Sequence, residues 1–445
     1  MSLLVDVAML VIVFIIFAYA IRHYRFYWNR TFAIQEQSSL DFVDAYTPAV
    51  SIVLPMKNEE KVASRLLDAL VKIDYPKENG RYEIIAVDDH STDKTPEIVD
   101  NYAARYGFIK AVHRSGGSVL TKPAALNAGL TFVNNEIVLF FDADYVPPKD
   151  CVKRLVAPFA NPLVVGVMGR VIPINSGETI VTRILDLERA AAYQVDQQAR
   201  QNLALIPQFG GTVGGFRRAF LSERGHSHFD PYHFAEDTDM TYRAYLSGWR
   251  VSYVNTAECY EEVVAKAQQR GVQVRRWAIG HNYCLFDYLL RTATSRFLPF
   301  WRKLDGVMLL GVYAMPFLQM VGWILGIYSY LFQPPFWSPL LFALFLTLAY
   351  NVVGNLALFS EIGSACYLDR RSRSIWLLPL MLPIVLYYVI VGTRAFIDSI
   401  IGHLFVRRKR RKEASESQEN TLSSNEKQVR TEWRKTQHSG NSEHS

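Results

Sequence analysis

Residues 137–144 read IVLFFDAD, and this stretch decides the fold. An unbroken apolar run followed by carboxylates is typical of a strand that is buried on both faces and ends at the surface. Similar runs begin at Val50, Glu83 and Val164, and helix-length amphipathic stretches follow the first two. This alternation predicts an α/β fold with a mostly parallel sheet covered by helices on both faces.

Carboxylates follow two of the expected strands. Asp88 and Asp89 end the second strand, and Asp142 and Asp144 end the third. Ligands of parallel sheets bind beyond the carboxyl ends of the strands, although such carboxylates also serve simply as helix caps. Asp142 and Asp144 are two residues apart in a turn, so both can direct oxygens at one hard cation while leaving positions for a diphosphate.

A phosphate-binding glycine loop is missing from the sequence, which argues against ATPase and dinucleotide-binding functions. A metal ion, rather than a helix N-terminus, is then expected to neutralise any phosphates. Lys122 is a candidate to assist it, with a solvated surface lysine as the alternative.

A second acidic group, Glu236-Asp237, opens an expected helix that runs through Leu246. Helix capping explains at least one of these carboxylates. The aromatic neighbours Phe234 and Tyr242 indicate partial burial, which raises the pKa of a carboxylate toward that of a useful base. Asp237 is therefore the candidate general base. The glycine-rich stretch 209–215 just upstream allows close backbone approach to a ligand, or is a plain loop.

Residues 273–277, QVRRW, lie between this carboxylate-rich region and a long uncharged stretch. Arg276 supplies a cation that can meet a phosphate, and Trp277 supplies an indole that can stack on a sugar ring. Arg-Trp pairs are also common at membrane interfaces, so this motif alone is a weak signal of function. Its place after the carboxylate motifs makes the signal strong.

Apolar segments at both ends predict membrane helices. Leu3–Ile21 is followed by basic residues and has no signal-peptide pattern, so we expect an anchor helix with its basic end in the cytosol. Asp305 to Glu361 encloses no charged residue and has room for two spans, expected at Gly306–Phe332 and Trp337–Ser360.

A third apolar run lies between Arg373 and Arg394. Three later crossings would place the basic run 407–412 outside, against the positive-inside rule. We therefore expect Pro379 and Pro383 to break this run into a short hairpin or re-entrant segment. The polar residues after Glu413 predict a disordered tail.

Bulk composition adds two constraints. The net charge of +6 is matched by the six positive charges of residues 407–412 alone, so it does not indicate nucleic-acid binding. The four cysteines show no close pairing, which predicts free thiols in a reducing compartment without a disulfide frame or a zinc site.

The motifs in this order, Asp88-Asp89, Asp142-Ala143-Asp144, Glu236-Asp237 and Gln273-x-x-Arg276-Trp277, flanked by membrane helices, resemble the processive membrane-bound family 2 glycosyltransferases. That group includes cellulose, chitin, hyaluronan and poly-N-acetylglucosamine synthases. The resemblance implies a GT-A-like nucleotide-sugar-binding domain. Ala235 stands where hyaluronan synthases carry glycine before two aspartates, which disfavours hyaluronan as the product.

The resemblance also implies roles at the donor side. Asp88, with Asp89 beside it, would contact the uracil of a UDP-sugar. Asp144, helped by Asp142, would hold Mg²⁺ or Mn²⁺ on the diphosphate.

On the acceptor side, Asp237, supported by Glu236, would deprotonate the acceptor hydroxyl. Gln273 and Trp277 would hold the terminal sugar of the acceptor, and Arg276 would brace the leaving diphosphate. The implied reaction is one inverting displacement that yields a β-linkage.

We expect a hexosyltransferase of the plasma membrane, with several spans and a cytoplasmic catalytic domain, that extends a β-linked polysaccharide and exports it, with an accessory export subunit possible. Transfer of a single sugar to a membrane lipid such as diacylglycerol is the alternative, and a non-catalytic scaffold is a third interpretation. The expected regions are a membrane anchor at 1–24, the transferase domain at 48–260, the motif with interfacial helices at 261–303, a membrane region at 304–405 and a basic, then disordered, cytosolic tail at 406–445.

Overall fold

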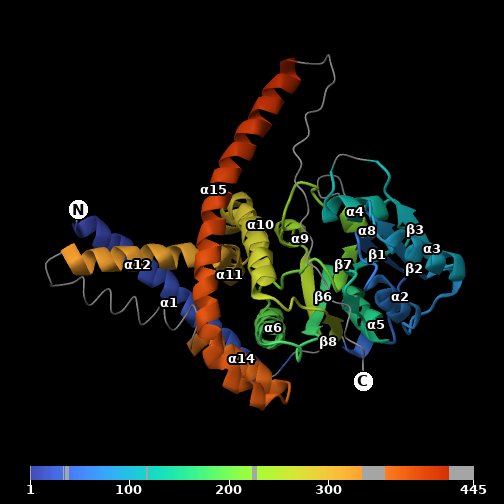
Figure 1. The fold of residues 1–445 in the computed structure, drawn as a ribbon, viewed down its shortest axis with the longest axis horizontal. Coiled ribbons are helices and arrows are strands. Elements are labelled where there is room, and N and C mark those ends of the chain that lie inside the picture. The colour runs from blue at the N-terminus through green and yellow to red at the C-terminus, as the bar shows by residue number, and fades with distance from the viewer. Residues whose placement is uncertain are drawn as a thin grey trace.

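The computed structural model describes residues 2–33, 35, 40–116, 119–222, 228–332 and 356–419. In Figure 1 the strands and their covering helices form one body, and long helices extend away from it on the side of the N-terminus. The chain therefore consists of an α/β part and a helical part, which meet at α6, α10 and α11.

Four parallel strands form the first half of an eight-stranded sheet of order β3-β2-β1-β4-β7-β6-β8-β5. Their bounds are Val50–Met56 (β1), Tyr82–Asp88 (β2), Ile109–His113 (β3) and Ile137–Phe140 (β4). Every residue of β1, β2 and β4 is buried, as expected for apolar strands covered on both faces.

The second half of the sheet is mixed. Its strands are Tyr145–Val146 (β5), Val164–Pro173 (β6), Gly214–Arg217 (β7) and Arg250–Glu261 (β8). Strand β7 runs antiparallel to both β4 and β6, whereas β6 and β8 are parallel. The expected mostly parallel α/β sheet is confirmed, with this antiparallel insertion as an addition to it.

The glycine-rich stretch 209–215 is not a plain loop. Gly214 and Gly215 lie inside β7, where a Cβ on Gly215 would sit 1.8 Å from the carbonyl oxygen of Val138. Only glycine fits between the two flanking strands at this distance. The sequence interpretation missed this strand because glycine is unfavourable in strands generally.

Helices cover the sheet, and several of them begin at the edge where the parallel strands end. Their bounds are Ala63–Val71 (α2), Thr95–Arg105 (α3), Lys122–Leu130 (α4), Cys151–Val156 (α5), Arg218–Ser222 (α8) and Glu236–Leu246 (α9), with short 3-10 turns at Leu40–Phe42 (η1), Glu78–Gly80 (η2) and Ala157–Ala160 (η3). Helix α2 buries Leu66, Leu67 and Leu70 on one face, the spacing of an amphipathic helix. All four cysteines are free and buried, as expected.

Two helical segments connect the sheet to the membrane part. One runs through Ile180–Ala190 (α6), the π-helix Ala191–Gln197 (η4) and Gln198–Asn202 (α7). The other is α10, Ala267–Ala293, which carries residues 273–277. Gly280 lets α10 approach the start of α9, because a Cβ there would lie 2.9 Å from the backbone nitrogen of Ala235.

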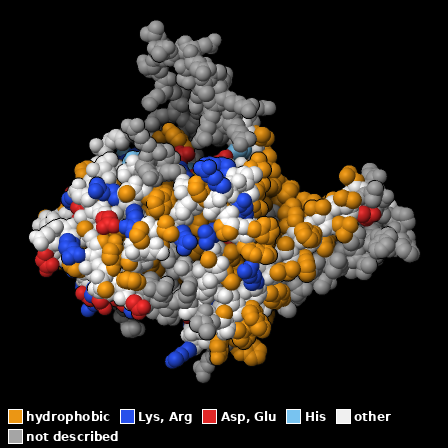
Figure 2. Space-filling view, turned by 180° about the vertical axis from the view of Figure 1, so that it is seen from behind, with side chains coloured by type: hydrophobic (Ala, Val, Ile, Leu, Met, Phe, Trp, Pro, Cys, Tyr) orange, Lys and Arg blue, Asp and Glu red, His pale blue; other side chains and the backbone are white. Residues whose placement is uncertain are grey.

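Three described helical stretches are long and apolar enough to cross a membrane: Leu4–Phe32, Phe300–Tyr328 and Ser374–Leu404. The first is Ser2–Phe32 (α1). The second runs through Phe300–Gly311 (α11), Val312–Ala314 (η5) and Met315–Phe332 (α12), and the third through Ser372–Leu380 (η6) and Met381–Glu419 (α15). A further helix among the described residues is Leu356–Leu368 (α14). Figure 2 shows hydrophobic side chains covering the arm that α1 and α12 form in Figure 1. Membrane association is therefore supported. The expected span Trp337–Ser360 lies largely outside the described residues.

Two expectations for the C-terminal part are wrong. Pro379 lies inside the 3-10 helix η6, which ends at Leu380, and Pro383 occupies the first turn of α15, where proline is tolerated. The segment therefore continues from η6 into one long helix instead of forming a hairpin. Helix α15 also extends through Glu419, beyond the point where the disordered tail was expected to begin. The rest of that tail lies outside the described residues.

Candidate active site

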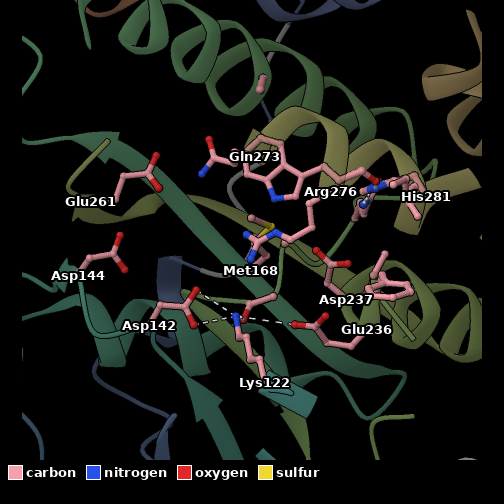
Figure 3. Close-up of a pocket in the computed structure, with 18 of the residues that line it drawn as sticks. Lys122, Asp142, Asp144, Met168, Glu236, Asp237, Glu261, Gln273, Arg276 and His281 are labelled. Carbon is pink, nitrogen blue, oxygen red and sulfur yellow. Dashed lines mark hydrogen bonds and ion pairs between the residues drawn. The ribbon is translucent and has the colours of Figure 1, made fainter. Parts of the chain in front are cut away.

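A cavity of about 930 Å³ opens where the ends of the strands meet α9, α10 and α11. It collects eight of the ten residues singled out in the sequence: Lys122, Asp142, Asp144, Glu236, Asp237, Gln273, Arg276 and Trp277. In Figure 3, Asp144 and Asp142 lie on one side of the cavity and Asp237 and Arg276 on the other. Residues far apart in sequence are thus brought to one site.

Lys122 lies at the centre of the carboxylates. Its ammonium is 2.7 Å from Asp142 Oδ1 and 3.8 Å from Glu236 Oε1, and it donates to the carbonyl of Gly211 at 3.0 Å. Burial alone would lower the pKa of Lys122, but Asp142 and Glu236 raise it above its ordinary value. The alternative of a solvated surface lysine is wrong.

Asp144 is buried close to several other carboxylates. Burial raises its pKa well above the ordinary value, and Asp142, Glu261 and Glu59 raise it further. No group of three or more ligating side chains that could hold a metal occurs in the described parts of the chain. Two carboxylates that depend on substrate phosphates for the remaining ligands are, however, the usual arrangement for Mg²⁺. The donor set of two carboxylates in one turn fits a divalent cation.

Asp237 occupies the first turn of α9. Thr238 donates its backbone N–H and, at 3.3 Å, its hydroxyl to Asp237 Oδ1. Burial raises the pKa of Asp237, while these hydrogen bonds and Lys122 oppose the shift. Glu236 beside it has a pKa raised to about 7, chiefly by burial. Gly211, at φ +79°, brings its backbone close to Asp237.

These shifts predict a pH dependence. If Asp237 accepts a proton, the rate must fall as pH falls through its pKa, because the protonated carboxyl cannot act as a base. This acid limb should lie above the ordinary aspartate range of about 3.9. Thr238→Val removes a hydroxyl that favours the ionised form, so the limb should move to higher pH. A pH profile of kcat/KM for the wild type and for Thr238→Val checks this. An acid limb in the ordinary aspartate range that is the same in both proteins would contradict it.

Gln273, Arg276 and Trp277 share one face of α10 because they are three and four residues apart. Within the described part of the chain, Arg276 forms no hydrogen bond or ion pair, so its guanidinium is available to an anion. The guanidinium groups of Arg189 and Arg270 lie 5.3 Å and 4.9 Å from the Trp277 ring centroid. The Trp277 ring thus lies beside two cations.

His281 also lines the cavity, although it is not among the residues singled out in the sequence. Its ring is packed within hydrogen-bond distance of three groups: the Trp277 carbonyl at 3.0 Å, the Gln208 amide at 2.9 Å and the Thr238 hydroxyl at 3.0 Å. Burial lowers its pKa to about 4, so it is neutral at pH 7. It links α10 to the residue beside Asp237. Its spacing of four from Trp277 was the available signal.

Asp88 and Asp89 do not line this cavity. Both are buried at the end of β2. Arg114 donates to Asp89 at 2.6 Å, and the ring of His113 lies 3.3 Å from Asp88 Oδ2. Their expected contact with a nucleotide base stays a prediction.

Known proteins support the transferase interpretation. Residues 51–225 match the model of Glycosyl transferase family 2. A probable glycosyltransferase of Bacillus subtilis is 33% identical over 54% of this chain and 57% of its own length. A beta-monoglucosyldiacylglycerol synthase of Nostoc is also 33% identical, over 54% of this chain and 50% of its own length.

A solved structure supports the fold. A mannosyltransferase from Pyrobaculum calidifontis, in complex with GDP-Man and Mn²⁺, superposes with a TM-score of 0.59 at 18% identity, covering 88% of this chain and 99% of that one. At this identity the likeness shows the fold alone. The chain spans about half the length of the curated relatives named above.

The fold is the GT-A arrangement that is also found in that mannosyltransferase. Residues 51–225 match the family 2 glycosyltransferase model, which supports the same class for this part of the chain. The expected enzyme class and fold class are confirmed at this level, and the acceptor, the sugar and the roles of single residues remain to be argued.

Proposed function

We propose that the protein transfers a hexose from a UDP-sugar to an acceptor hydroxyl at the membrane, with inversion to a β-linkage. One observation carries the proposal: a single cavity joins the carboxylates Asp142, Asp144 and Asp237 to Arg276 and to α11, part of a candidate membrane span. A base, a phosphate-binding cation and a membrane-facing wall are the parts that such a transfer needs.

Each part has a role in this proposal. Asp237 accepts the proton of the attacking hydroxyl, and the neighbouring Glu236 supports it in this role. Arg276 stabilises the negative charge that builds up on the leaving diphosphate, and Lys122 adds a second positive charge 2.7 Å from Asp142. Asp88 and Asp89 would contact the nucleotide base, as the family resemblance implies.

A divalent cation fits at Asp142 and Asp144, which would hold it with oxygens of the diphosphate. When bound, it supplies Lewis-acid stabilisation of the leaving group. Chelation by EDTA should therefore abolish transfer, and Mn²⁺ or Mg²⁺ should restore it. Asp144→Asn should raise the metal concentration needed for half-maximal rate. Undiminished transfer in EDTA would contradict the metal assignment.

The acceptor that we favour is a growing β-linked polysaccharide, exported as it grows. Amides and aromatic rings, the groups that commonly contact sugars, contribute to the part of the lining around α10: Gln208, Gln268, Gln269, Gln273, Tyr193, Tyr313 and Trp277. We place the transferase domain in the cytoplasm, with several spans in the plasma membrane and an accessory export subunit as a further partner.

A membrane lipid such as diacylglycerol is the second candidate acceptor. The cavity is also lined by Leu309 and Val312, which belong to a candidate span, so an alkyl chain has an apolar wall to lie against. The named relative from Nostoc carries this activity in its name.

Product length distinguishes the two acceptors. Purified protein in nanodiscs should convert UDP-sugar into chains many units long, measured by gel filtration of a radiolabelled product. The donors to compare are UDP-glucose, UDP-N-acetylglucosamine and UDP-galactose. A product that extracts into organic solvent and carries one sugar would establish the lipid acceptor and contradict the proposal that the protein extends a polysaccharide.

A further inference from the structure

Arg270 lies one turn before Gln273 on α10 and contacts two residues of the QVRRW motif. Its Nη1 donates to Gln273 Oε1 at 2.7 Å, and its guanidinium lies 4.9 Å from the Trp277 ring centroid. One side chain outside the motif thus contacts two side chains within it.

The contact with Arg270 sets the polarity of the Gln273 amide. A guanidinium has five donors and no acceptor, so the atom that faces it must be the amide oxygen. Within the described residues, the Gln273 nitrogen has no hydrogen-bond partner. In Figure 3 this nitrogen lies on the side of Asp142 and Asp144, and the oxygen points the other way. Gln273 therefore presents an NH₂ donor to the cavity.

Arg270 is itself held by two other elements. Its Nη2 lies 2.5 Å from Glu188 Oε2 on α6, and its Nε donates to the Tyr388 hydroxyl at 2.9 Å. That hydroxyl in turn donates to Glu188 Oε1 at 2.9 Å. Tyr388 belongs to α15, inside the candidate span Ser374–Leu404. Three helices, one of them from the membrane part, meet at this guanidinium.

Arg270, Glu188 and Tyr388 form a brace that is largely shielded from solvent, so its hydrogen bonds are strong. The Arg270 side chain is 11% exposed and that of Glu188 is 18% exposed. Hydrogen bonds between charged groups in such surroundings are stronger than neutral ones and costly to leave unpaired. Rotation of the Gln273 amide would place its NH₂ group against Arg270, donor against donor, and is therefore disfavoured.

We propose that Arg270 is a positioning residue for the acceptor subsite: braced by Glu188 and Tyr388, it fixes the Gln273 amide so that its NH₂ group donates to an oxygen of the acceptor. The proposal rests on the proposed function, because it needs an acceptor at Gln273. It restricts the acceptor group at this point to a hydrogen-bond acceptor, such as a hydroxyl, ring or carbonyl oxygen. It also makes docking of α15 a condition for a complete acceptor subsite.

The test is a double-mutant cycle on Arg270→Met and Gln273→Ala in full-length protein in nanodiscs. Each single variant should raise KM for the acceptor by roughly tenfold, while donor KM and the rate of donor hydrolysis change less than about twofold. The double variant should be about as impaired as either single variant, because each removes the same oriented amide. Arg291→Met is the matched control, since Arg291 lies on the same helix over the Tyr288 ring and outside the cavity lining.

Tyr388→Phe provides a milder perturbation that removes one oxygen and should raise acceptor KM by a few-fold. Additive effects in the cycle, or equal losses in donor and acceptor parameters, would show that Arg270 is merely structural and overturn the proposal. If wild-type protein transfers no sugar to any acceptor, the proposed function fails instead. If wild-type transfers and Arg270→Met matches it, only the positioning role fails.

Discussion

Asp237→Asn lowers the rate of sugar transfer by roughly 10²- to 10⁴-fold, the usual contribution of a general base. The substitution preserves size and polarity but removes the lone pair that accepts the proton. The amide can still receive the N–H and hydroxyl hydrogen bonds of Thr238 through its oxygen, so the start of α9 should stay in place. Steady-state transfer from UDP-sugar measures the loss.

Two controls make that result specific. Binding of UDP, measured by calorimetry, should remain nearly unchanged in Asp237→Asn, because the donor side of the cavity is intact. Asp287→Asn, an exposed position on α10, should leave transfer at the wild-type rate. If Asp237→Asn retains more than a few per cent of the rate, another group is the base.

Arg276→Gln should lower kcat by roughly 10²- to 10³-fold, which is the scale observed when one preorganised charge-stabilising donor is removed. Arg276 has no intramolecular partner among the described residues, so the variant leaves no buried carboxylate unpaired and should fold normally. The loss therefore reports on stabilisation of the leaving diphosphate. Single-turnover kinetics with saturating donor measure it.

Arg291→Gln on the same helix is the matched control for Arg276→Gln and should be as active as wild type. Donor KM should change less than kcat, since the charge on the diphosphate grows during the reaction. A variant that binds donor weakly but reacts at full rate once saturated would assign Arg276 to ground-state binding instead.

Continuous apolar strands were readable from the sequence because burial on both faces leaves a simple pattern. The runs at Val50, Glu83 and Ile137 correspond to β1, β2 and β4. Strand β8, Arg250–Glu261, was missed because its second half alternates buried and partly exposed residues. Strand β7 was missed because its glycines reflect close packing between neighbouring strands, and no local pattern encodes that contact.

The site shows the same division between local and long-range information. The sequence grouped Gln273, Arg276 and Trp277 in one motif, and their spacing of three and four residues places them on one face of α10. The central place of Lys122 was left open, because it depends on Asp142 and Glu236, which come from other elements. The contact between Arg270 and Tyr388 could not be predicted from the sequence. Tyr388 follows Arg270 by 118 positions, and only the packing of α15 on α10 brings the two together.

The anomeric configuration of the first transferred sugar tests the central claim most directly. Full-length protein in nanodiscs is supplied with a ¹³C-labelled, α-linked UDP-sugar and Mn²⁺, and the new linkage is read from the anomeric coupling constant by NMR. A single displacement in which Asp237 deprotonates the acceptor predicts a β-linkage. An α-linked product, or release of free sugar without any transfer, would contradict the account of this cavity as an inverting transferase site.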